Sequence, residues 1–148
     1  MAKNKRVPDF MLETFLESGG GIGLSITLFV KGVVITGNIT KVSDFYRKAV
    51  VEQLDVDGSV GLEDFAKELA EEEAEYKRIS DLPDEERTED QRKAVAAPHN
   101  FINLTDAHYQ IGDGSLVPGG EKGLNVRVRA EAVDAWVLGR MSVERRAG

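Results

Sequence analysis

One stretch constrains the fold of this chain more than any other, residues 21–40, which read GIGLSITLFVKGVVITGNIT. Over 22–30, aliphatic residues alternate with small, polar or aromatic ones. This two-residue period predicts a strand with one buried face, because successive side chains leave opposite sides of the pleat. A Lys-Gly pair at 31–32 interrupts the alternation where glycine can take a positive φ. β-branched residues resume over 33–39, so the stretch predicts a β-hairpin, with a bulge at Gly37.

Alternation returns in the last third of the chain. It predicts strands over 101–111, 124–131 and 132–141, with a loop rich in glycine and proline before the second of them. Because an isolated hairpin is only marginally stable in water, the two separated groups of strands should pair in one sheet. The expected fold class is α+β: a small, strongly bent antiparallel sheet or partly open barrel, with an N-terminal helix and a helical acidic insertion.

Three stretches are expected to be helical. A Pro-Asp pair at 8–9 favours the start of a short helix that ends at glycines 19–21. Ser43 can cap a helix over 44–54, although the same residues also alternate, so that a strand is the competing prediction. Apolar residues at three- and four-residue steps over 62–79 predict a longer helix with an acidic outer side.

The whole chain, 1–148, is expected to form a single domain. Its β core would comprise 21–42 and 100–141, and the helical and acidic insertion would comprise 43–98. Within the insertion, residues 81–91 are the most polar stretch, which favours a mobile linker or a weakly docked helix.

Composition excludes several classes of function. The sequence has no cysteine, which rules out disulfides, thiolate catalysis and cysteine-ligated zinc. No apolar run approaches the roughly 20 residues that span a bilayer, and the N-terminus lacks the apolar core of a signal peptide, so we expect a cytoplasmic protein without a membrane partner. A net charge of −7 argues against nucleic-acid binding, which relies on basic surfaces.

Motifs for metal or cofactor chemistry are weak, and no cofactor or metal site is predicted. The acidic stretch 55–59 resembles the start of a calcium loop, but Val60 stands where the loop needs glycine and Ala66 where it needs glutamate. The acidic turn is therefore the favoured interpretation. His99 and His108 are the only histidines, and no sequence motif supplies a nucleophile for either. An enzyme that uses His108 stays a minor hypothesis.

A candidate interaction surface can be assembled from charged and aromatic residues. Two arginines share one face of a strand, where they can grip an acidic segment or simply face solvent beside acidic neighbours. The sole tryptophan is either a core residue or an interface anchor. Three successive glutamates form either a solvated helix face or a docking surface for a basic partner. The candidate residues are Arg127, Arg129, Trp136, Glu71, Glu72 and Glu73.

Two blocks of sequence carry a family resemblance. They are LSITLFVKGVVITGNITKVSDFYRKAV, and FINLTDAHYQIGDG followed by NVRVRAEAVDAWVLGRMS. The order of a glycine-turned hairpin, a "TG" strand, an acidic insertion, an F-I-x-L-x-x-A strand and a V-x-x-W-x-L-G strand resembles the gas vesicle accessory protein family of type U. The resemblance implies a non-enzymatic cytoplasmic protein without catalytic residues, which is associated with gas vesicles and acts on their clustering. The first hypothesis is therefore an accessory protein that self-associates, binds gas vesicle proteins through its sheet edges and acidic insertion, and modulates vesicle clustering or assembly.

A second resemblance is architectural. The hairpin, followed by the aspartate-containing segment 43–45, also looks like the first half of an Sm-like RNA-binding barrel. This alternative, a module that binds nucleic acid or a nucleotide, gains if 44–51 is a strand. The acidic balance of the chain counts against it, and fold alone does not fix function.

Overall fold

The structure of the chain is a computed structural model, and it describes residues 9–20, 22–52, 60–120 and 122–141. The acidic turn expected at 55–59 and both chain ends lie outside these residues. The chain divides into two compact units, which are described separately below. They are a sheet unit, Met1–Lys41 with His99–Gly148, and a helical unit, Val42–Pro98.

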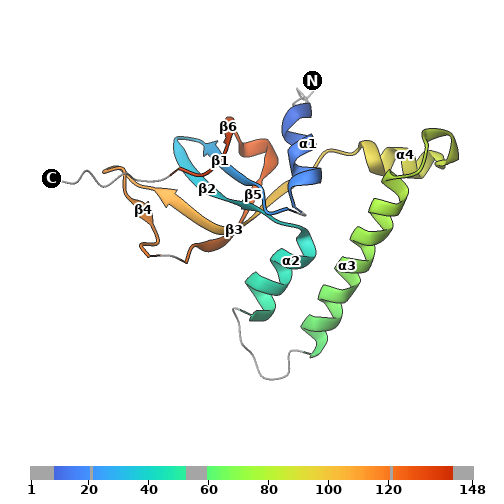
Figure 1. The fold of residues 1–148 in the computed structure, drawn as a ribbon, viewed down its shortest axis with the longest axis horizontal. Coiled ribbons are helices and arrows are strands. Elements are labelled where there is room, and N and C mark those ends of the chain that lie inside the picture. The colour runs from blue at the N-terminus through green and yellow to red at the C-terminus, as the bar shows by residue number, and fades with distance from the viewer. Residues whose placement is uncertain (1–8, 21, 53–59, 121, 142–148) are drawn as a thin grey trace, which may run out of the picture. The chain divides into compact units, whose positions relative to one another are not determined.

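The sheet unit contains one helix and six strands among its described residues (Figure 1). The strands form an antiparallel sheet in the order β4-β3-β2-β1-β6, with β5 beside β4 along the same edge of β3. No described residues of β5 and β6 pair, so the sheet is not closed into a barrel. The expected α+β class with an N-terminal helix is confirmed. The elements are α1 Phe10–Gly19, β1 Ser25–Val30, β2 Val33–Ile39, β3 Phe101–Gln110, β4 Leu116–Val117, β5 Leu124–Arg129 and β6 Ala135–Leu138.

The predicted hairpin is confirmed. Strands β1 and β2 pair residue for residue up to the turn, where Lys31 has φ 49° and Gly32 has φ 82°. Two successive positive φ angles give the turn whose twist matches that of the flanking strands. The first strand begins at Ser25 rather than Ile22, because Gly23 has φ 65° and so leaves the extended region.

One extra residue in β3 makes a bulge at the centre of the sheet and shifts the pairing with both neighbouring strands. The pairing of β2 with β3 shifts register between Thr36 and Asn38, so the irregularity predicted at Gly37 is present, but the extra residue lies in the facing strand β3. The pairing of β3 with β5 shifts just before Ala107, where Asp106 has φ 51°. A positive φ in an aspartate is uncommon and marks a position that its surroundings hold in place.

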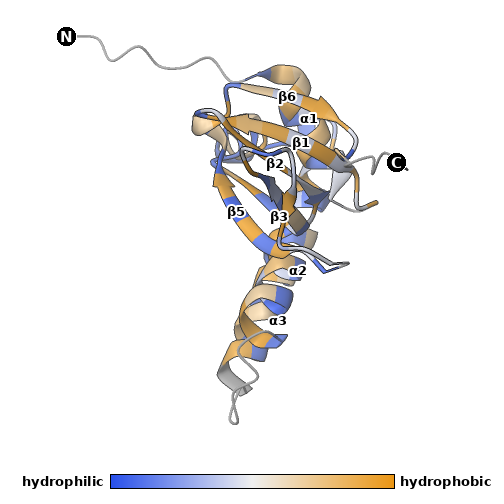
Figure 2. Ribbon diagram, turned by 90° about the vertical axis from the view of Figure 1, so that its left-hand side faces the viewer, coloured by the Kyte–Doolittle hydropathy of each residue, from blue (hydrophilic) through white to orange (hydrophobic). Residues whose placement is uncertain are grey.

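The core lies on one face of the sheet, beneath α1. In Figure 2 the strands are coloured largely orange, in line with this apolar core. The opposite side of the sheet, called the outer face below, carries the alternate residues of each strand. The core residues come from four strands and the helix: Leu12, Leu16, Ile26, Leu28, Ile35, Ile39, Ile102, Leu104, Ala107 and Val128.

The last third of the chain differs in detail from the sequence prediction. The strand expected over 132–141 is shorter, because a 3₁₀ turn occupies Ala130–Ala132 and Gly139 leaves the extended region with φ 100°. Strand β5 accordingly ends at Arg129. The loop before it contains the two-residue strand β4, which is too short to show any periodicity in the sequence.

The helical unit confirms the helix expected after the hairpin. Helix α2, Val42–Tyr46, continues as a π-helical segment, Arg47–Glu52. The competing strand over 44–51 is therefore wrong, and the Sm-like hypothesis loses the strand that would have favoured it. The rest of the unit consists of α3 Val60–Ser80, a 3₁₀ turn Asp84–Glu86 and α4 Glu89–Ala96.

Local hydrogen bonds explain where the helices of this unit begin and end. Thr88 and Gln91 form a reciprocal capping box at the start of α4. The Arg87 side chain donates to the carbonyl oxygens of Ile79 (3.0 Å) and Ser80 (2.5 Å), which lack partners within α3 as the last carbonyls of a helix. No residue of α4 is fully buried. The polar stretch thus contains a weakly docked helix, one of the two predicted alternatives.

Candidate interaction surface

The two predicted arginines lie together on the outer face of β5. Arg127 is directly opposite Asn103 of β3, and Arg129 is directly opposite Phe101. Both guanidinium side chains are exposed. The alternation predicted for this strand is correct, because Val128 between them is buried on the core side.

The two arginines have different neighbours. The Arg127 guanidinium carbon lies 4.0 Å from the centroid of the Phe101 ring, a cation–π contact. The Arg129 guanidinium is 3.8 Å from the Glu131 carboxylate, and both side chains are well exposed. An exposed ion pair of this kind contributes little, so Arg129 stays available to other anions.

Asn103 lies beside Arg127 on the same face. The residue is 6% exposed, and its side-chain oxygen has no hydrogen-bond partner within the described ranges. Its backbone oxygen accepts from the Thr40 amide at 2.9 Å, as the ladder between β2 and β3 requires. A buried acceptor without a donor is costly, and no pattern in the sequence indicates it.

Trp136 joins β6 to α1. Its indole Nε1 donates to Asp9 Oδ2 at 2.8 Å, and its ring meets Phe15 edge to face with centroids 5.6 Å apart. The other Asp9 oxygen accepts from the amides of Met11 and Leu12 and caps α1. The Trp136 hydrogen bond, followed by these amides, lowers the pKa of Asp9. Of the two roles considered for the tryptophan, the half-buried packing role is the one seen within this unit.

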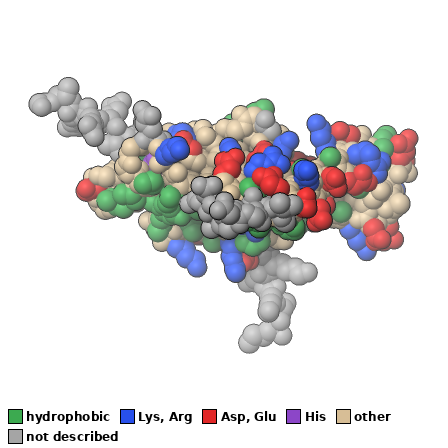
Figure 3. All heavy atoms as spheres, turned by 90° about the horizontal axis from the view of Figure 1, so that it is seen from below, with side chains coloured by type: hydrophobic (Ala, Val, Ile, Leu, Met, Phe, Trp, Pro, Cys, Tyr) green, Lys and Arg blue, Asp and Glu red, His purple; other side chains and the backbone are tan. Residues whose placement is uncertain are grey.

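The three glutamates of α3 are not equivalent. Glu71 and Glu72 are exposed, whereas Glu73 is half-buried. Ser43, at the start of α2, donates to the Glu73 carboxylate through its amide (2.8 Å) and its hydroxyl (2.5 Å). Acidic and basic side chains are intermixed on the face shown in Figure 3. The glutamate run therefore offers two outward carboxylates, with the third engaged inside the helical unit.

The structure brings together only part of the predicted set within the sheet unit. Arg127 and Arg129 are neighbours on β5, whereas Trp136 belongs to β6 at the opposite edge of the sheet. The described strand order thus separates the cationic residues from the tryptophan.

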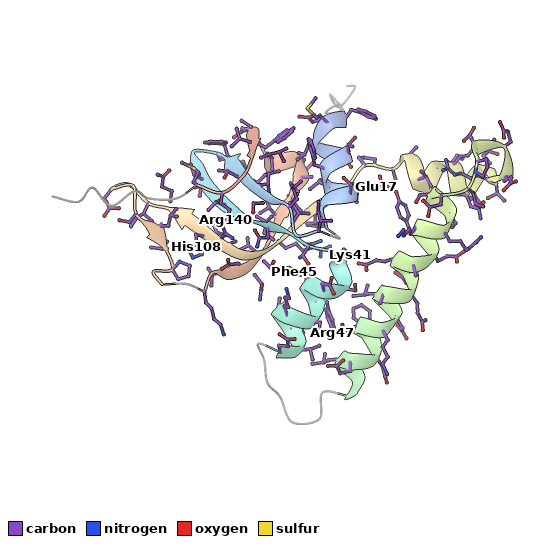
Figure 4. All side chains as sticks on the ribbon, in the orientation of Figure 1. Glu17, Lys41, Phe45, Arg47, His108 and Arg140 are labelled. Carbon is purple, nitrogen blue, oxygen red and sulfur yellow. The ribbon has the colours of Figure 1, made fainter. Side chains whose placement is uncertain are left out.

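A polar cluster around Arg140 was not predicted. The Arg140 guanidinium donates to Asp106 Oδ2 (3.0 Å), Asn38 Oδ1 (3.2 Å) and His108 Nδ1 (3.3 Å), and it also contacts the Asp106 carbonyl oxygen. Figure 4 labels Arg140 and His108, which lie on the same part of the sheet. No sequence spacing connects these four positions, because the sheet assembles them from β2, β3 and the segment after β6.

The cluster holds the segment that follows β6, residues 139–141, on the outer face. We call this segment the strap. Besides the Arg140 contacts, Thr27 Oγ1 donates to the Gly139 carbonyl at 2.8 Å, and the Met141 amide donates to Thr36 Oγ1 at 3.0 Å. Because an arginine only donates, His108 Nδ1 must accept. These contacts attach the strap to the outer face of the sheet.

The remaining histidine also has a structural contact. The His99 amide donates to Glu13 Oε2 at 2.9 Å, and its ring Nδ1 contacts the same oxygen, which links α1 to the start of β3. Among the described residues, no group of three or more acidic or histidine side chains is arranged to hold a metal ion. Within the same residues, no helix is both long and apolar enough to span a bilayer.

The fold and this surface define an α+β protein with an open antiparallel sheet, a separate helical unit and polar clusters that mainly join its own elements. The chain belongs to the gas vesicle protein GvpU-like family, whose profile matches residues 9–141. This membership suggests a gas vesicle accessory protein. No curated protein and no solved structure matches the chain.

Proposed function

We propose that this chain is a non-enzymatic, cytoplasmic gas vesicle accessory protein that self-associates, binds gas vesicle proteins and modulates vesicle clustering or assembly. The observation that carries the proposal is the family match over residues 9–141. The match covers both the sheet unit and the helical unit, so the proposal concerns the chain as a whole.

The sheet unit has features suited to contacts with other proteins. Strands β6 and β5 each pair on one side only among the described strands, and an open strand edge can accept another strand. Apolar side chains are exposed near one of these edges, with Val137 51% exposed on β6 and Phe10 85% exposed on α1, the helix to which β6 is joined through Trp136. Exposed apolar residues beside an open edge support a role in association rather than catalysis.

A flotation experiment tests the proposal. Purified gas vesicles are mixed with the purified protein and spun so that the vesicles rise, and the protein in the floating layer is quantified. We expect wild-type protein in this layer and an increase in vesicle cluster size by dynamic light scattering. A variant with Val137 and Phe10 both changed to lysine should float less.

The matched control adds the same two positive charges at exposed positions of the helical unit, Ala94→Lys with Ala96→Lys, and should float like the wild type. A separate variant, Glu71→Lys with Glu72→Lys, tests the glutamate pair as a contact surface and should also float less. If the wild-type protein stays wholly below the vesicles, is monomeric by light scattering and leaves cluster size unchanged, the proposed function is wrong.

A further inference from the structure

We propose that the open edge of β5 is a strand-addition site for an extended segment of a partner protein that carries carboxylates at alternate positions with an apolar residue between them. The inference rests on the proposed function in that it names the partner chemistry of a protein-binding surface. It is argued from the hydrogen-bond register of β5, from the side chains at that edge, and from charge.

The register shows which main-chain groups are open. The Ala130 amide donates to the Asn100 carbonyl at 2.9 Å, and the pairing of Ile102 with Val128 follows the same register. In an antiparallel ladder every second residue bonds to the neighbouring strand. Val128 therefore bonds towards β3, and the N–H and C=O groups of Arg127 and Arg129 point to the side where no described strand pairs.

The side chains of the same two residues select the partner. In an antiparallel strand added at this edge, the residues opposite Arg127 and Arg129 would lie two apart and project from the outer face. Directly opposed side chains have Cβ atoms roughly 5 Å apart, which is within reach of a charge-assisted hydrogen bond. Carboxylates at those two positions fit the guanidinium groups. The residue between them would project on the core side beside Val128, which is buried, so an apolar residue fits there.

Charge also excludes the simplest self-pairing. If β5 of a second copy added antiparallel to this edge, arginine would stand opposite arginine on the outer face. Like charges directly opposite each other are destabilising. The chain itself contains two acidic–apolar–acidic sequences, Asp55-Val-Asp57 and Glu73-Ala-Glu75. The second lies within helix α3, so a second copy acting through Asp55-Val-Asp57 is the outcome that the experiment must distinguish.

The first test uses a labelled synthetic peptide, acetyl-Ser-Thr-Glu-Val-Glu-Thr-Ser-amide, and its counterpart with lysine in place of both glutamates, with binding measured by fluorescence anisotropy at low salt. We expect the wild-type protein to prefer the glutamate peptide. Reversing charge in the double variant Arg127→Glu, Arg129→Glu should weaken that binding about tenfold and should make the lysine peptide the better ligand. The matched control, Lys67→Glu with Lys93→Glu, makes the same charge change at exposed positions of the helical unit and should shift affinity less than twofold.

The second test separates strand addition from simple charge attraction. In the proposed register the amides of both glutamates bond to β5, whereas the amide of the central valine points away. N-methylation of either glutamate should therefore abolish binding, and N-methylation of the valine should leave it nearly unchanged. The proposal would be overturned if a peptide N-methylated at a glutamate bound as well as the peptide N-methylated at the valine. Equal binding of the glutamate and lysine peptides would also overturn it.

Two further measurements assign the partner and separate this proposal from the proposed function. The first asks whether the wild-type protein forms an oligomer that dissociates when both Asp55→Asn and Asp57→Asn are introduced. That result would show that a second copy of this chain occupies the β5 edge, and it would overturn the proposal of a different partner protein. If the peptide fails to bind while wild-type protein still floats with vesicles, the β5 site is wrong and vesicle association stands. Peptide binding without flotation would uphold the site and contradict the proposed function.

Discussion

At the scale of single residues, side chains that are far apart in the sequence fix the ends of the structural elements. Asp9 is an example, because one of its carboxylate oxygens caps α1 and the other accepts from Trp136 of β6. Asp106 is another, because its carboxylate receives the Gly123 amide and the Arg140 guanidinium. Each contact can be tested by a substitution with a matched control.

The Trp136 hydrogen bond should make the stability of the fold depend on pH. The pKa of Asp9 is lowered in the folded state, chiefly by this bond. Its ionised form therefore stabilises the fold above the unfolded pKa of about 3.9, and this contribution is lost as pH falls through the lower folded pKa. We expect Trp136→Phe to lower the free energy of unfolding at about pH 6, and the difference from wild type to shrink towards about pH 3.

Urea unfolding followed by far-UV circular dichroism measures this difference without relying on tryptophan fluorescence. In an Asp9→Asn background the Trp136→Phe difference should no longer vary with pH. A difference that is constant across the whole range would contradict the assigned role of Asp9.

Gly123 should be irreplaceable for a steric reason. A Cβ atom at this position would stand 2.6 Å from the backbone oxygen of Ala107 and would also overlap the backbone of Asp106, at the bulge where that residue has φ 51°. Backbone atoms cannot give way as a flexible side chain can. We expect Gly123→Ala to reduce the free energy of unfolding by about 3 kcal/mol, measured by chemical denaturation.

Gly112→Ala is the matched control, because nothing lies within 4 Å of its added Cβ. Its effect should stay within about 0.5 kcal/mol. If Gly123→Ala lowered the free energy of unfolding as little as Gly112→Ala does, the backbone at Gly123 would not lie so close to Asp106 and Ala107.

At the scale of elements, the sequence predicted what periodicity can encode. The hairpin, β3, β5 and α3 were all located from alternation or from three- and four-residue spacing, since each has one buried face. The ends of β1 and β6 were misplaced, because φ at Gly23 and Gly139 decides them and a glycine letter does not reveal its φ.

The candidate site was harder to predict than the fold. Alternation placed Arg127 and Arg129 on one face correctly, but the direction of their backbone groups depends on the register with β3, which appears only once the sheet is assembled. The Arg140 cluster was missed for the same reason, because its members come from three separate segments. Glu73 was grouped with its exposed neighbours since charge alone does not show which carboxylate finds an internal donor.

Glu73 should matter more to stability than Glu72, although the two are adjacent in one acidic run. Glu73→Gln keeps the shape of the side chain but removes the charge that accepts two hydrogen bonds from Ser43. Hydrogen bonds to charged groups contribute more than neutral ones, so we expect a loss of about 1–2 kcal/mol in the free energy of unfolding. Glu72→Gln, at an exposed position, should change it by less than about 0.5 kcal/mol.

Hydrogen exchange can localise the effect. The Glu73→Gln variant should exchange faster at amides near the start of α2, and Glu72→Gln should not. Identical exchange in both variants would mean that the contact between Ser43 and Glu73 does not hold α2 to α3.

At the scale of the whole molecule, the helical unit is an insertion in the chain between β2 and β3, which are neighbouring strands of the sheet. The register of β2 with β3 continues past Ile39, and the Thr40 amide donates to the Asn103 carbonyl at 2.9 Å. Short connections suffice to join adjacent antiparallel strands. We therefore propose that the single domain expected over 1–148 has a sheet unit that folds without the insertion.

Replacing residues 43–98 by a Gly/Ser link of about six residues tests this proposal. We expect the shortened protein to keep strand-type circular dichroism, dispersed amide NMR signals and a cooperative melting transition. Its flotation with vesicles, compared with that of the full chain, then measures what the acidic insertion contributes. A product without cooperative melting would show that the sheet needs the insertion.

Attachment of the strap to the sheet can be followed by proteolysis at Arg140. Trypsin cleaves after arginine only when the side chain can enter the protease's specificity pocket, and the Arg140 side chain is instead engaged with Asp106 and Asn38. Cleavage at this one bond therefore requires the strap to detach first. The rate of that cleavage, followed by mass spectrometry in the presence of any bound partner, would reveal whether binding tightens or loosens the end of the sheet.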